Sequence, residues 1–242
     1  MTTLTTEAGT RIDRFRALTK GVEGWINPLS VRIWDVMLGW QAQEGSPGDM
    51  LEVGVWHGRT AALLALHANA GERIHLVDFN RHEPLDDNLD RFRDHCAGTI
   101  ELTIADSFTF FNDAFMSEHR RRLRWIHIDG SHEASGLHSD LLHAESLLAK
   151  NGVLVVDDFM NPMFPQVSEV TFEFMHQRRH ELSLTLNGAN KAYIVRPLHH
   201  KTILRRIESG AFEREIAALG MEIELRKGTH LDRPVYGVRP SK

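Results

Sequence analysis

The sequence predicts an α/β fold: a Rossmann-like, mostly parallel sheet with helices on both faces and an antiparallel C-terminal hairpin. Short apolar runs recur along the chain, and segments of helical spacing separate them. The runs are almost continuously apolar, as in strands buried on both faces of a sheet. This alternation is typical of βαβ units, which build parallel sheets.

Each expected element follows from a local pattern. The strands are predicted at residues 50–55, 73–79, 100–105, 123–128 and 152–156. Good helix formers predict crossover helices at 61–66 and 137–150, which end near Gly71 and at Asn151-Gly152. Residues 182–186 and 192–195 flank a turn-rich segment and predict a hairpin. We expect the sheet to be complete near Arg196.

The length of 242 residues favours one large domain with appendages. We expect a helical cap over residues 1–45, a ligand-binding core over 46–197, and an extension over 198–242 with a helix at 203–219 and a strand near 235–238. The tryptophans Trp25, Trp34 and Trp40 lie at helical spacing in the cap. They predict a buried core or a contact in a homo-oligomer, with a partner-docking surface as the alternative.

Composition narrows the protein class. No apolar run reaches the length of a membrane span, and no basic segment followed by an apolar one marks a secretory signal at the start. The only cysteine, Cys96, fits a reducing cytoplasm. The net charge of -5 argues against nucleic-acid binding. The basic run at 120–124 is interpreted as a solvated helix end. We therefore expect a cytoplasmic protein that binds neither membranes nor nucleic acids.

A glycine turn follows the first expected strand and opens a helix. Its notable residues are Glu52, Gly54, Trp56, Gly58 and Thr60. Glycines let the backbone approach a ligand at the carboxyl end of a strand, where open α/β sheets bind their ligands. The Gly-x-x-x-Gly spacing differs from the tighter motif of dinucleotide-binding folds, which weakens the prediction of a nicotinamide cofactor.

Acidic residues stand at the ends of the next two strands. Asp78 ends the second strand, where a carboxylate can accept hydrogen bonds from ribose hydroxyls. Asp106 and Ser107 end the third strand, near where the adenine ring of a bound nucleotide-like cofactor would lie. Capping of the following helix is the structural alternative for each acid.

Three further carboxylates are expected to converge. Asp129 ends the fourth strand, and Asp157 and Asp158 end the fifth. Such a cluster repels itself unless a cation compensates it, and oxygen ligands favour a hard ion such as Mg²⁺. A helix cap is again the alternative for the pair. His132 follows Asp129 closely, and its neutral form would serve as a general base.

Other histidines carry no metal-binding pattern. His199 and His200, and likewise His138 and His143, lack cysteine partners and recognisable ligand spacing. We interpret these four as structural residues.

Together, these motifs resemble the class I methyltransferases of the macrocin O-methyltransferase type, which use S-adenosylmethionine (SAM) and act on sugar hydroxyls. The resemblance spans about residues 49–196 and rests on the glycine turn, Asp78, Asp106-Ser107, Asp129-Gly-Ser-His132 and Asp157-Asp158. The core 46–197 would then be a SAM-binding methyltransferase core.

The resemblance also implies residue roles. Glu52, Gly54, Gly58 and Thr60 would surround the methionine part of SAM, Asp78 would bind ribose, and Ser107 with Phe108 would border adenine. Asp129, Asp157 and Asp158 would ligate Mg²⁺, and His132 would be the base. The acceptor would be a sugar, a glycosylated natural product or another small vicinal diol.

Asn161, Met163 and Phe164 are candidates for the acceptor pocket, although Asn161-Pro162 is equally a turn signal. Two other functions stay open: a nicotinamide-dependent oxidoreductase and a non-catalytic Rossmann-like binding module.

Overall fold

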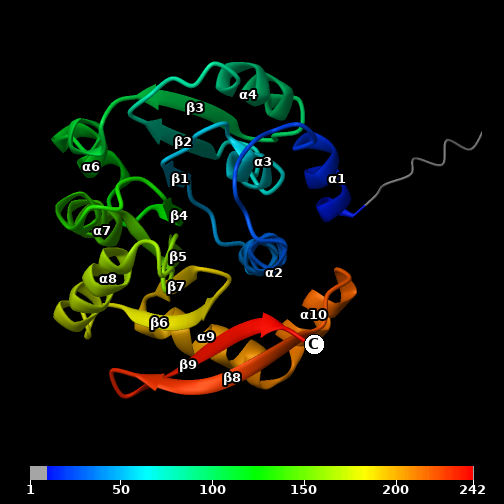
Figure 1. Ribbon diagram of the computed structural model, residues 1–242, viewed down its shortest axis with the longest axis vertical. Coiled ribbons are helices and arrows are strands. Elements are labelled where there is room, and N and C mark those ends of the chain that lie inside the picture. The colour runs from blue at the N-terminus through cyan, green and yellow to red at the C-terminus, as the bar shows by residue number, and fades with distance from the viewer. Residues whose placement is uncertain (1–9, 242) are drawn as a thin grey trace, which may run out of the picture.

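One nine-stranded sheet organises the computed structural model, which describes residues 10–241 (Figure 1). The strand order is β3-β2-β1-β4-β5-β7-β6-β9-β8. Its parallel half contains β1 (Met50–Val53), β2 (Arg73–Asp78), β3 (Thr99–Ile104), β4 (Leu123–Ile128) and β5 (Leu148–Val156). Because β1 pairs with both β2 and β4, the strand order reverses beside β1, which is where such folds bind ligands.

The predicted parallel strands are all present, and the predicted fold class is confirmed. The central strands β1 and β4 are buried at every position, which explains why they are mostly apolar. Their polar residues Glu52, Arg124 and His127 are buried as well. Strand β5 begins at Leu148, four residues before its predicted start, because residues before Gly152 already extend it. The helix predicted at 61–66 is α3 (Arg59–Ala65), and the one at 137–150 is α7 (Ala134–Leu147).

The predicted hairpin is also present. It joins β6 (Ser183–Gly188) to β7 (Lys191–Val195), which pair in antiparallel fashion, and β7 pairs with β5. The turn residues Ala189 and Asn190 both have positive φ angles, of 51° and 60°. This backbone form matches the twist of a tight hairpin.

The sheet does not end near Arg196, so that prediction is wrong. Strand β9 (Arg233–Pro240) pairs in parallel with β6, and β8 (Ile223–His230) pairs with β9 at the sheet edge. Pairing with β9 satisfies the backbone groups that β6 would otherwise expose. The predicted strand near 235–238 is therefore part of β9.

The helix predicted at 203–219 is two helices, α9 (Pro197–Glu208) and α10 (Ala211–Ala218). Gly210 separates them with a φ of 72°, a left-handed conformation that interrupts the helix and that glycine adopts without strain. The single-helix prediction missed this break because apolar residues keep a helical spacing across it.

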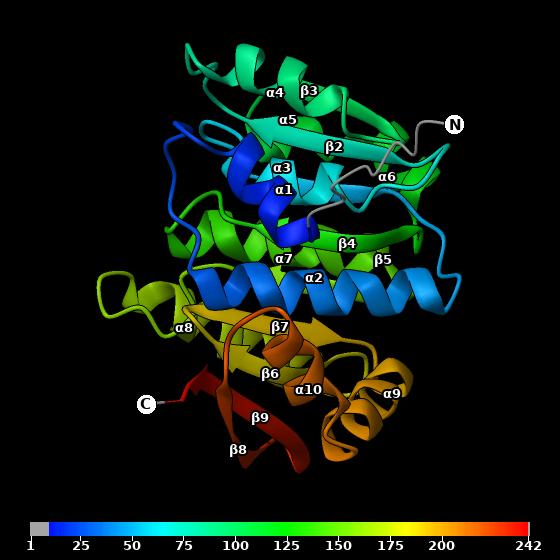
Figure 2. The same cartoon turned by 90° about the vertical axis from the view of Figure 1, so that its right-hand side faces the viewer.

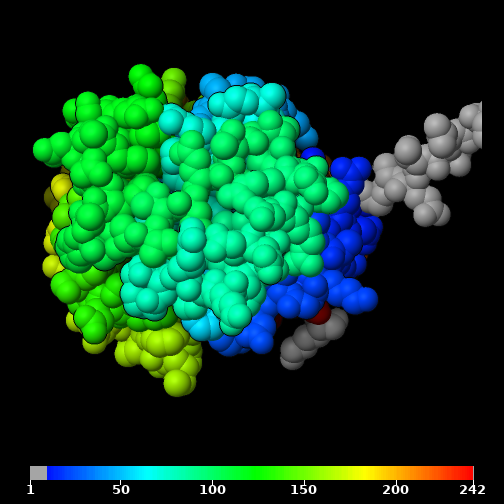
Figure 3. Space-filling view, turned by 90° about the horizontal axis from the view of Figure 1, so that it is seen from above, coloured from blue at the N-terminus to red at the C-terminus, as the bar shows by residue number. Residues whose placement is uncertain are grey.

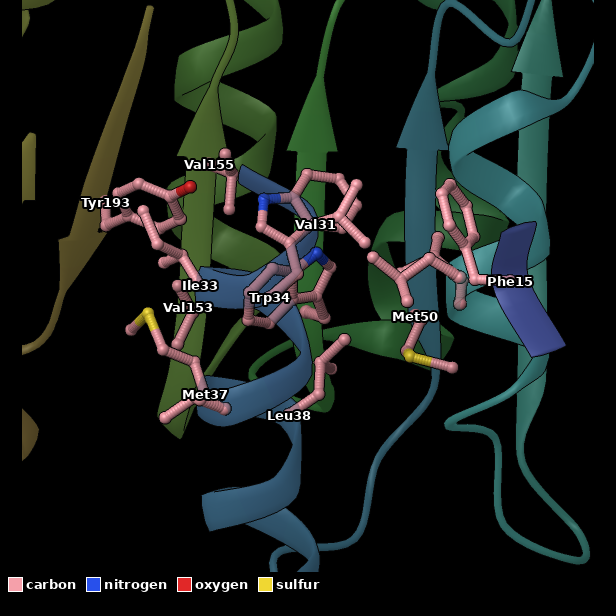
Figure 4. Close-up of a cluster of buried hydrophobic side chains, with 14 of the residues drawn as sticks. Phe15, Val31, Ile33, Trp34, Met37, Leu38, Met50, Val153, Val155 and Tyr193 are labelled. Carbon is pink, nitrogen blue, oxygen red and sulfur yellow. The ribbon is translucent and has the colours of Figure 1, made fainter. Parts of the chain in front are cut away.

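Helix α2 (Pro28–Gln43) is central to one face of the sheet. Its side chains Ile33, Trp34, Met37 and Leu38 point onto the strands, where Figure 4 shows them beside Met50, Val153, Val155 and Tyr193. Trp34 and Trp40 are buried, as expected for core residues, but Trp25 is 87% exposed. Residues 10–45 thus contribute to the main core, while residues 1–9 of the expected cap lie outside the described residues.

The other helices complete two layers. Helices α1 (Arg11–Leu18), α3, α9 and α10 share the hydrophobic cluster of α2, together with α4 (Leu85–Arg93). The opposite face is covered by α7 and α8 (Pro165–Gln177), with α5 (Ser107–Phe110) and α6 (Asp113–His119) beside α7 (Figures 1 and 2). Seen from above, the β3 and α4 segments form the middle of the surface, and α1 lies beside them (Figure 3).

The basic run at 120–124 divides at the sheet. Arg120, Arg121 and Arg122 are exposed, as predicted, but Arg124 is 2% exposed. Its guanidinium bonds to both carboxylate oxygens of Glu72, at 2.9 and 2.7 Å. Arg124 is the second residue of β4, which is buried at every position, so the strand carries this one arginine into the interior. Among the described helices, none combines the length and apolarity needed to cross a bilayer.

Candidate functional site

A cavity of about 1430 Å³ opens over the carboxyl ends of the parallel strands. The segments that follow β1 to β5 all contribute to its lining, as do the 23–27 loop and the β6–β7 turn. Of the predicted site residues, those that line it are Gly54, Trp56, Thr60, Asp78, Asp106, Ser107, Phe108, Asp129, His132, Asp157, Asp158, Asn161 and Phe164. Glu52, Gly58 and Met163 do not line it.

The glycine turn is required by backbone packing. Gly54 has a φ of 85°, and a Cβ atom there would lie 1.9 Å from the carbonyl oxygen of Asp129. Gly58 also has a positive φ and directs its missing side chain toward Leu85 and Leu89. The first glycine lets β1 approach β4 closely, and the second packs α3 against α4. Gly54 lines the cavity through its backbone, whereas Gly58 acts on it only through helix packing.

Asp78 is buried against the glycine turn. Its Oδ2 accepts hydrogen bonds from the backbone N–H groups of Val55 (2.8 Å) and Trp56 (2.9 Å), and its Oδ1 accepts one from Asn80 (2.9 Å). These bonds hold the β1 and β2 loops together at the cavity. The carboxylate lines the cavity and still has lone pairs for a ligand.

Asp106, the acid that follows the third strand, has the helix-capping role that was its structural alternative. Asp106 is the N-cap of α5 and accepts hydrogen bonds from the backbone N–H and the hydroxyl of Thr109, at 2.9 and 2.8 Å. Hydrogen bonds from Thr109 hold the pKa of Asp106 below its usual value. Ser107 and Phe108 follow at the cavity wall, and Phe108 is 62% exposed.

A buried ionic network lies beneath the cavity floor. The His127 Nδ1 atom is 2.8 Å from Glu52 Oε1, and its Nε2 atom is 3.3 Å from Asp157 Oδ2. The ammonium of Lys191 also bonds to Asp157. Burial alone would lower the pKa of His127, but the bonds to Asp157 and Glu52 raise it to about 9. Two carboxylates and two cations therefore balance one another here.

Asp129 lies outside that balance. Its pKa is held well above its ordinary value by burial and by the neighbouring Asp157 carboxylate. The pKa of Asp157 is instead lowered, since hydrogen bonds to His127 and Lys191 outweigh its burial. A cation beside Asp129 would relieve the penalty of ionising it.

Asp158 and His132 form a pair at the cavity wall. The Nε2 atom of His132 is 2.8 Å from Asp158 Oδ2, and the His132 ring stacks on Phe164 with a centroid distance of 3.9 Å. Asn161 donates to the other Asp158 oxygen at 2.6 Å. Helix α8 begins with Phe164 as its N-cap residue and has no side-chain cap, so the acidic pair does not cap this helix.

The three predicted metal ligands divide into two sets that share Asp129. One combines Asp129 with His132 and Asp158, and the other combines it with His127 and Asp157. Within each set, one ligand atom per residue lies within 4.8 Å of the others. The donors fit a hard divalent cation, because the unbalanced Asp129 carboxylate lies between two further acids.

Exposed aromatic side chains surround the cavity. Trp25, which is 87% exposed, lies with its ring centroid 6.4 Å from that of Trp56. Phe79 and Phe108 also line the cavity and are largely exposed. Asn161 forms a local turn in which its side-chain oxygen accepts from the Met163 backbone at 3.0 Å, so the turn interpretation holds. Met163 itself is 76% exposed.

Asp140 is a cavity residue that the sequence reasoning missed. It lies on α7, is 1% exposed, and neither carboxylate oxygen has a hydrogen-bond partner among the described residues. Burial raises its pKa to about 6. The signal in the sequence was an acid on the helix face that also carries Leu137, Leu141 and Ala144.

The histidines interpreted as structural join no three-residue cluster of metal ligands in the described part of the chain. His200 bonds to the Thr185 hydroxyl at 2.8 Å, and His143 stacks on Phe111. His138 packs edge-on against Phe174. These contacts agree with the structural interpretation.

Comparison with known proteins identifies the domain. Residues 51–159 match the family model described as a methyltransferase domain. No curated protein sequence is similar enough to this chain to count as a relative. The family match covers the glycine turn, Asp129 and both acids that end β5. Residues 51–159 therefore match a methyltransferase domain, and the predicted methyltransferase class is confirmed.

Several solved methyltransferases share the fold. CalS11, the TDP-rhamnose 3'-O-methyltransferase of calicheamicin biosynthesis, has a TM-score of 0.53 at 16% identity over 81% of this chain and 97% of that chain. An O-methyltransferase from Bacillus cereus in complex with SAH has a TM-score of 0.52 at 12% identity over 79% and 91% of the chains.

A third similar structure contains a metal. The MycE methyltransferase of the mycinamycin biosynthetic pathway, in complex with Mg, SAH and mycinamycin VI, has a TM-score of 0.53 at 13% identity. The superposition covers 75% of this chain and 53% of that chain. These likenesses show the class I methyltransferase fold. They do not show which acceptor or metal this protein binds.

Proposed function

We propose that this protein is a SAM-dependent O-methyltransferase that uses a divalent metal to methylate a hydroxyl group of a sugar or another small vicinal diol. The observation that carries the proposal is the unbalanced carboxylate of Asp129, which lies between Asp158 and Asp157 at the floor of a methyltransferase cavity. The two alternatives from the sequence, a nicotinamide oxidoreductase and a binding module, are not favoured by the methyltransferase-domain match.

The cofactor is assigned to the side of the cavity formed by β1 to β3. Gly54 and Thr60 would face the methionine part, Asp78 would accept from the ribose, and Ser107 with Phe108 would border the adenine. Glu52 is fully buried and bonded to His127, so we assign it support of the floor. Gly58 would act through the course of the turn. The cavity volume of about 1430 Å³ leaves room for an acceptor beside the cofactor.

The metal would be held by Asp129, Asp158 and the Asp157 Oδ1 atom. This atom accepts a hydrogen bond from the Asp158 backbone N–H at 2.7 Å and is not the oxygen that bonds to Lys191. A bound divalent ion such as Mg²⁺ supplies Lewis acidity, which lowers the pKa of a coordinated hydroxyl. Lys191 and His127 neutralise the inner side of Asp157, so the protein leaves one side of the carboxylate cluster for a cation. Because these carboxylates would hold a Lewis-acidic cation, hydroxyl activation is the chemistry that the residues support best.

We assign His132 the role of the base that removes the acceptor's hydroxyl proton. Asp158 orients its ring through the 2.8 Å contact, and the stacked Phe164 restricts the ring plane. The His132 imidazole would take the acceptor's hydroxyl proton, and bound SAM would supply the methyl group to the freed oxygen and leave as its demethylated product. Holding oxygen and methyl in line supplies much of the acceleration.

Exposed aromatic residues support an acceptor with an apolar part. Trp25, Trp56 and Phe108 present flat surfaces at the cavity, and such rings stack well on sugars and on the ring systems of natural products. Asn161, which donates a hydrogen bond to Asp158, would contact the acceptor there. The proposed substrate class therefore rests on these side chains, whereas the domain match supports only methyl transfer.

The test is methyl transfer from labelled SAM to a panel of sugars, catechols and other vicinal diols, with added Mg²⁺ or excess EDTA. We expect product with Mg²⁺, loss in EDTA, and loss in Asp158→Asn. Glu169→Gln on the exposed side of α8 is the matched control and should retain activity.

Full activity in EDTA together with an active Asp158→Asn variant would refute the metal role. A protein that binds NAD but neither SAM nor its demethylated product would favour the oxidoreductase. Calorimetric titration of the three cofactors separates these outcomes from failure to find the acceptor.

A further inference from the structure

A second cluster of metal-ligand residues lies at the opposite end of the sheet from the cavity. Asp49 directly precedes β1, His75 is the third residue of β2, and His119 ends α6. One ligand atom from each lies within 4.8 Å of the other two. The three residues come from separate elements, so only the fold brings them together.

The two imidazoles point their Nε2 atoms at the same carboxylate oxygen. The Asp49 Oδ2 atom is 3.6 Å from His75 Nε2 and 3.7 Å from His119 Nε2. Both distances exceed a hydrogen bond, and His75 Nε2 is a buried atom without a partner. Ligands on a tetrahedral zinc ion, with bonds of about 2.0 Å, would lie only slightly closer together.

Outer contacts prepare both histidines to act as ligands. His75 Nδ1 is 3.2 Å from Glu101 Oε2, and His119 Nδ1 is 3.1 Å from the carbonyl oxygen of Phe115. These acceptors place the ring proton on Nδ1 in each neutral imidazole, so the Nε2 lone pair faces Asp49. Metal-binding histidines usually have an outer acceptor of this kind.

Arg73 supplies the positive charge beside the cluster of Asp49, His75 and His119. Its Nε is 3.4 Å from Asp49 Oδ2, and its Nη2 atom is 2.8 Å from Glu118 Oε1 and 3.3 Å from His119 Nε2. The side chain is 38% exposed and flexible, so it can turn into solvent without leaving a buried charge. Glu118, whose Oε1 is 3.9 Å from His119 Nε2, can then approach the vacated position.

We propose that Asp49, His75 and His119 form a zinc-binding site that ties α6 to the amino ends of β1 and β2. Two imidazoles and a carboxylate are a ligand set that zinc accepts, with Glu118 or water in the fourth position. Binding replaces one cation, the Arg73 guanidinium, with another.

The proposal is tested on the full chain carrying Asp129→Asn and Asp158→Asn, which removes the cavity cluster as a competing site. Zinc is titrated by calorimetry, and Co²⁺ is used as a spectroscopic probe of the ligands. We expect saturable binding with a tetrahedral Co²⁺ spectrum. Adding His75→Gln or His119→Gln should abolish binding, whereas His143→Gln and Cys96→Ser should leave it unchanged.

Two exposed positions keep the test decisive if a buried histidine variant fails to fold. Arg73→Gln should strengthen zinc binding by about tenfold, since a unit charge within about 4 Å repels the ion. Glu101→Gln should weaken it roughly 10- to 100-fold through the outer contact to His75. Thermal melting checks that both variants fold.

Absence of zinc binding in the parent double variant would overturn the proposal. Binding that survives His119→Gln, or that Cys96→Ser removes, would place the metal elsewhere and also overturn it. Neither result depends on methyl transfer, so the outcome is independent of the proposed function.

Discussion

The two ends of the parallel strands both gather carboxylates and histidines, yet they differ in access and in charge balance. At the carboxyl ends, Asp129 and Asp158 face a cavity of about 1430 Å³, and the cations near Asp129, which are His127 and Lys191, are bonded to other carboxylates. At the amino ends, Arg73 and Arg124 pair with the acids, and α6 covers the histidines. Residue type alone therefore does not distinguish the end that binds small molecules; the open, unbalanced cluster does.

The largest expected effect lies at the carboxyl end. His132→Gln should lower kcat for methyl transfer by about 10²- to 10⁴-fold, because the variant loses the proposed base. Steady-state kinetics with an acceptor identified by the panel assay provides the measurement. The exposed His176→Gln on α8 is the control and should behave as the parent. If His132→Gln retained the parent's kcat, His132 would not be the catalytic base.

At the amino end, the largest effect should be on stability. Arg124→Met leaves the carboxylate of Glu72 buried without its partner and should lower the free energy of unfolding by about 3–5 kcal/mol. Arg122→Met, from the exposed part of the same basic run, should change it by less than about 0.5 kcal/mol. Urea denaturation measures both. Equal effects would show that the burial of Arg124 does not matter.

Asp140 gives the carboxyl end a distinct pH dependence. Its pKa, raised to about 6 by burial, means that the folded state binds this proton more tightly than the unfolded state does. Its contribution to stability is thus present below about pH 4 and is lost as the pH rises through about 6. Between these limits the parent should lose about 3 kcal/mol relative to Asp140→Asn.

Denaturation curves of parent and Asp140→Asn across pH 4 to 8, without cofactor, provide this measurement. Asp94→Asn, at an exposed position after α4, should follow the parent in parallel. Should the Asp140→Asn curve also run parallel to the parent, the raised pKa would be wrong.

The smallest effect is expected at the rim. Trp25→Ala should raise the acceptor KM by about tenfold through lost stacking. Stability should hardly change, because the side chain is 87% exposed. Leu198→Ala, another exposed apolar residue but on α9, is the control. An unchanged KM would restrict acceptor binding to the inner cavity.

The parallel half of the fold could be predicted because each strand has its own local signal. Strand β4 is buried at every position and β5 over its last five, so their sequences are mostly apolar. An acid follows each of them, Asp129 after β4 and Asp157 after β5. Strand β8 was missed because it lies at the sheet edge, where none of its residues is fully buried and its pattern is polar. The break at Gly210 was missed because the apolar spacing continues across it.

The candidate site was predictable where its residues are neighbours in the chain. Asp129 and His132 share one loop, and Asp157 and Asp158 share another, so strand pairing was enough to suggest that they meet. Lys191 could not be placed, because its contact with Asp157 depends on how the hairpin returns along β5. The same holds for Asp140, whose burial depends on the packing of α7.

The sequence by itself determined the fold class, the glycine turn and the acids at the strand ends, because a strand followed by a turn and a helix is written in consecutive residues. Only the tertiary structure decided which charges are balanced. It paired Asp157 with His127 and Lys191, left Asp129 unbalanced at the cavity, and gathered Asp49, His75 and His119 at the other end. Charge balance depends on distances of a few ångströms between segments far apart in the chain, and only packing sets those distances.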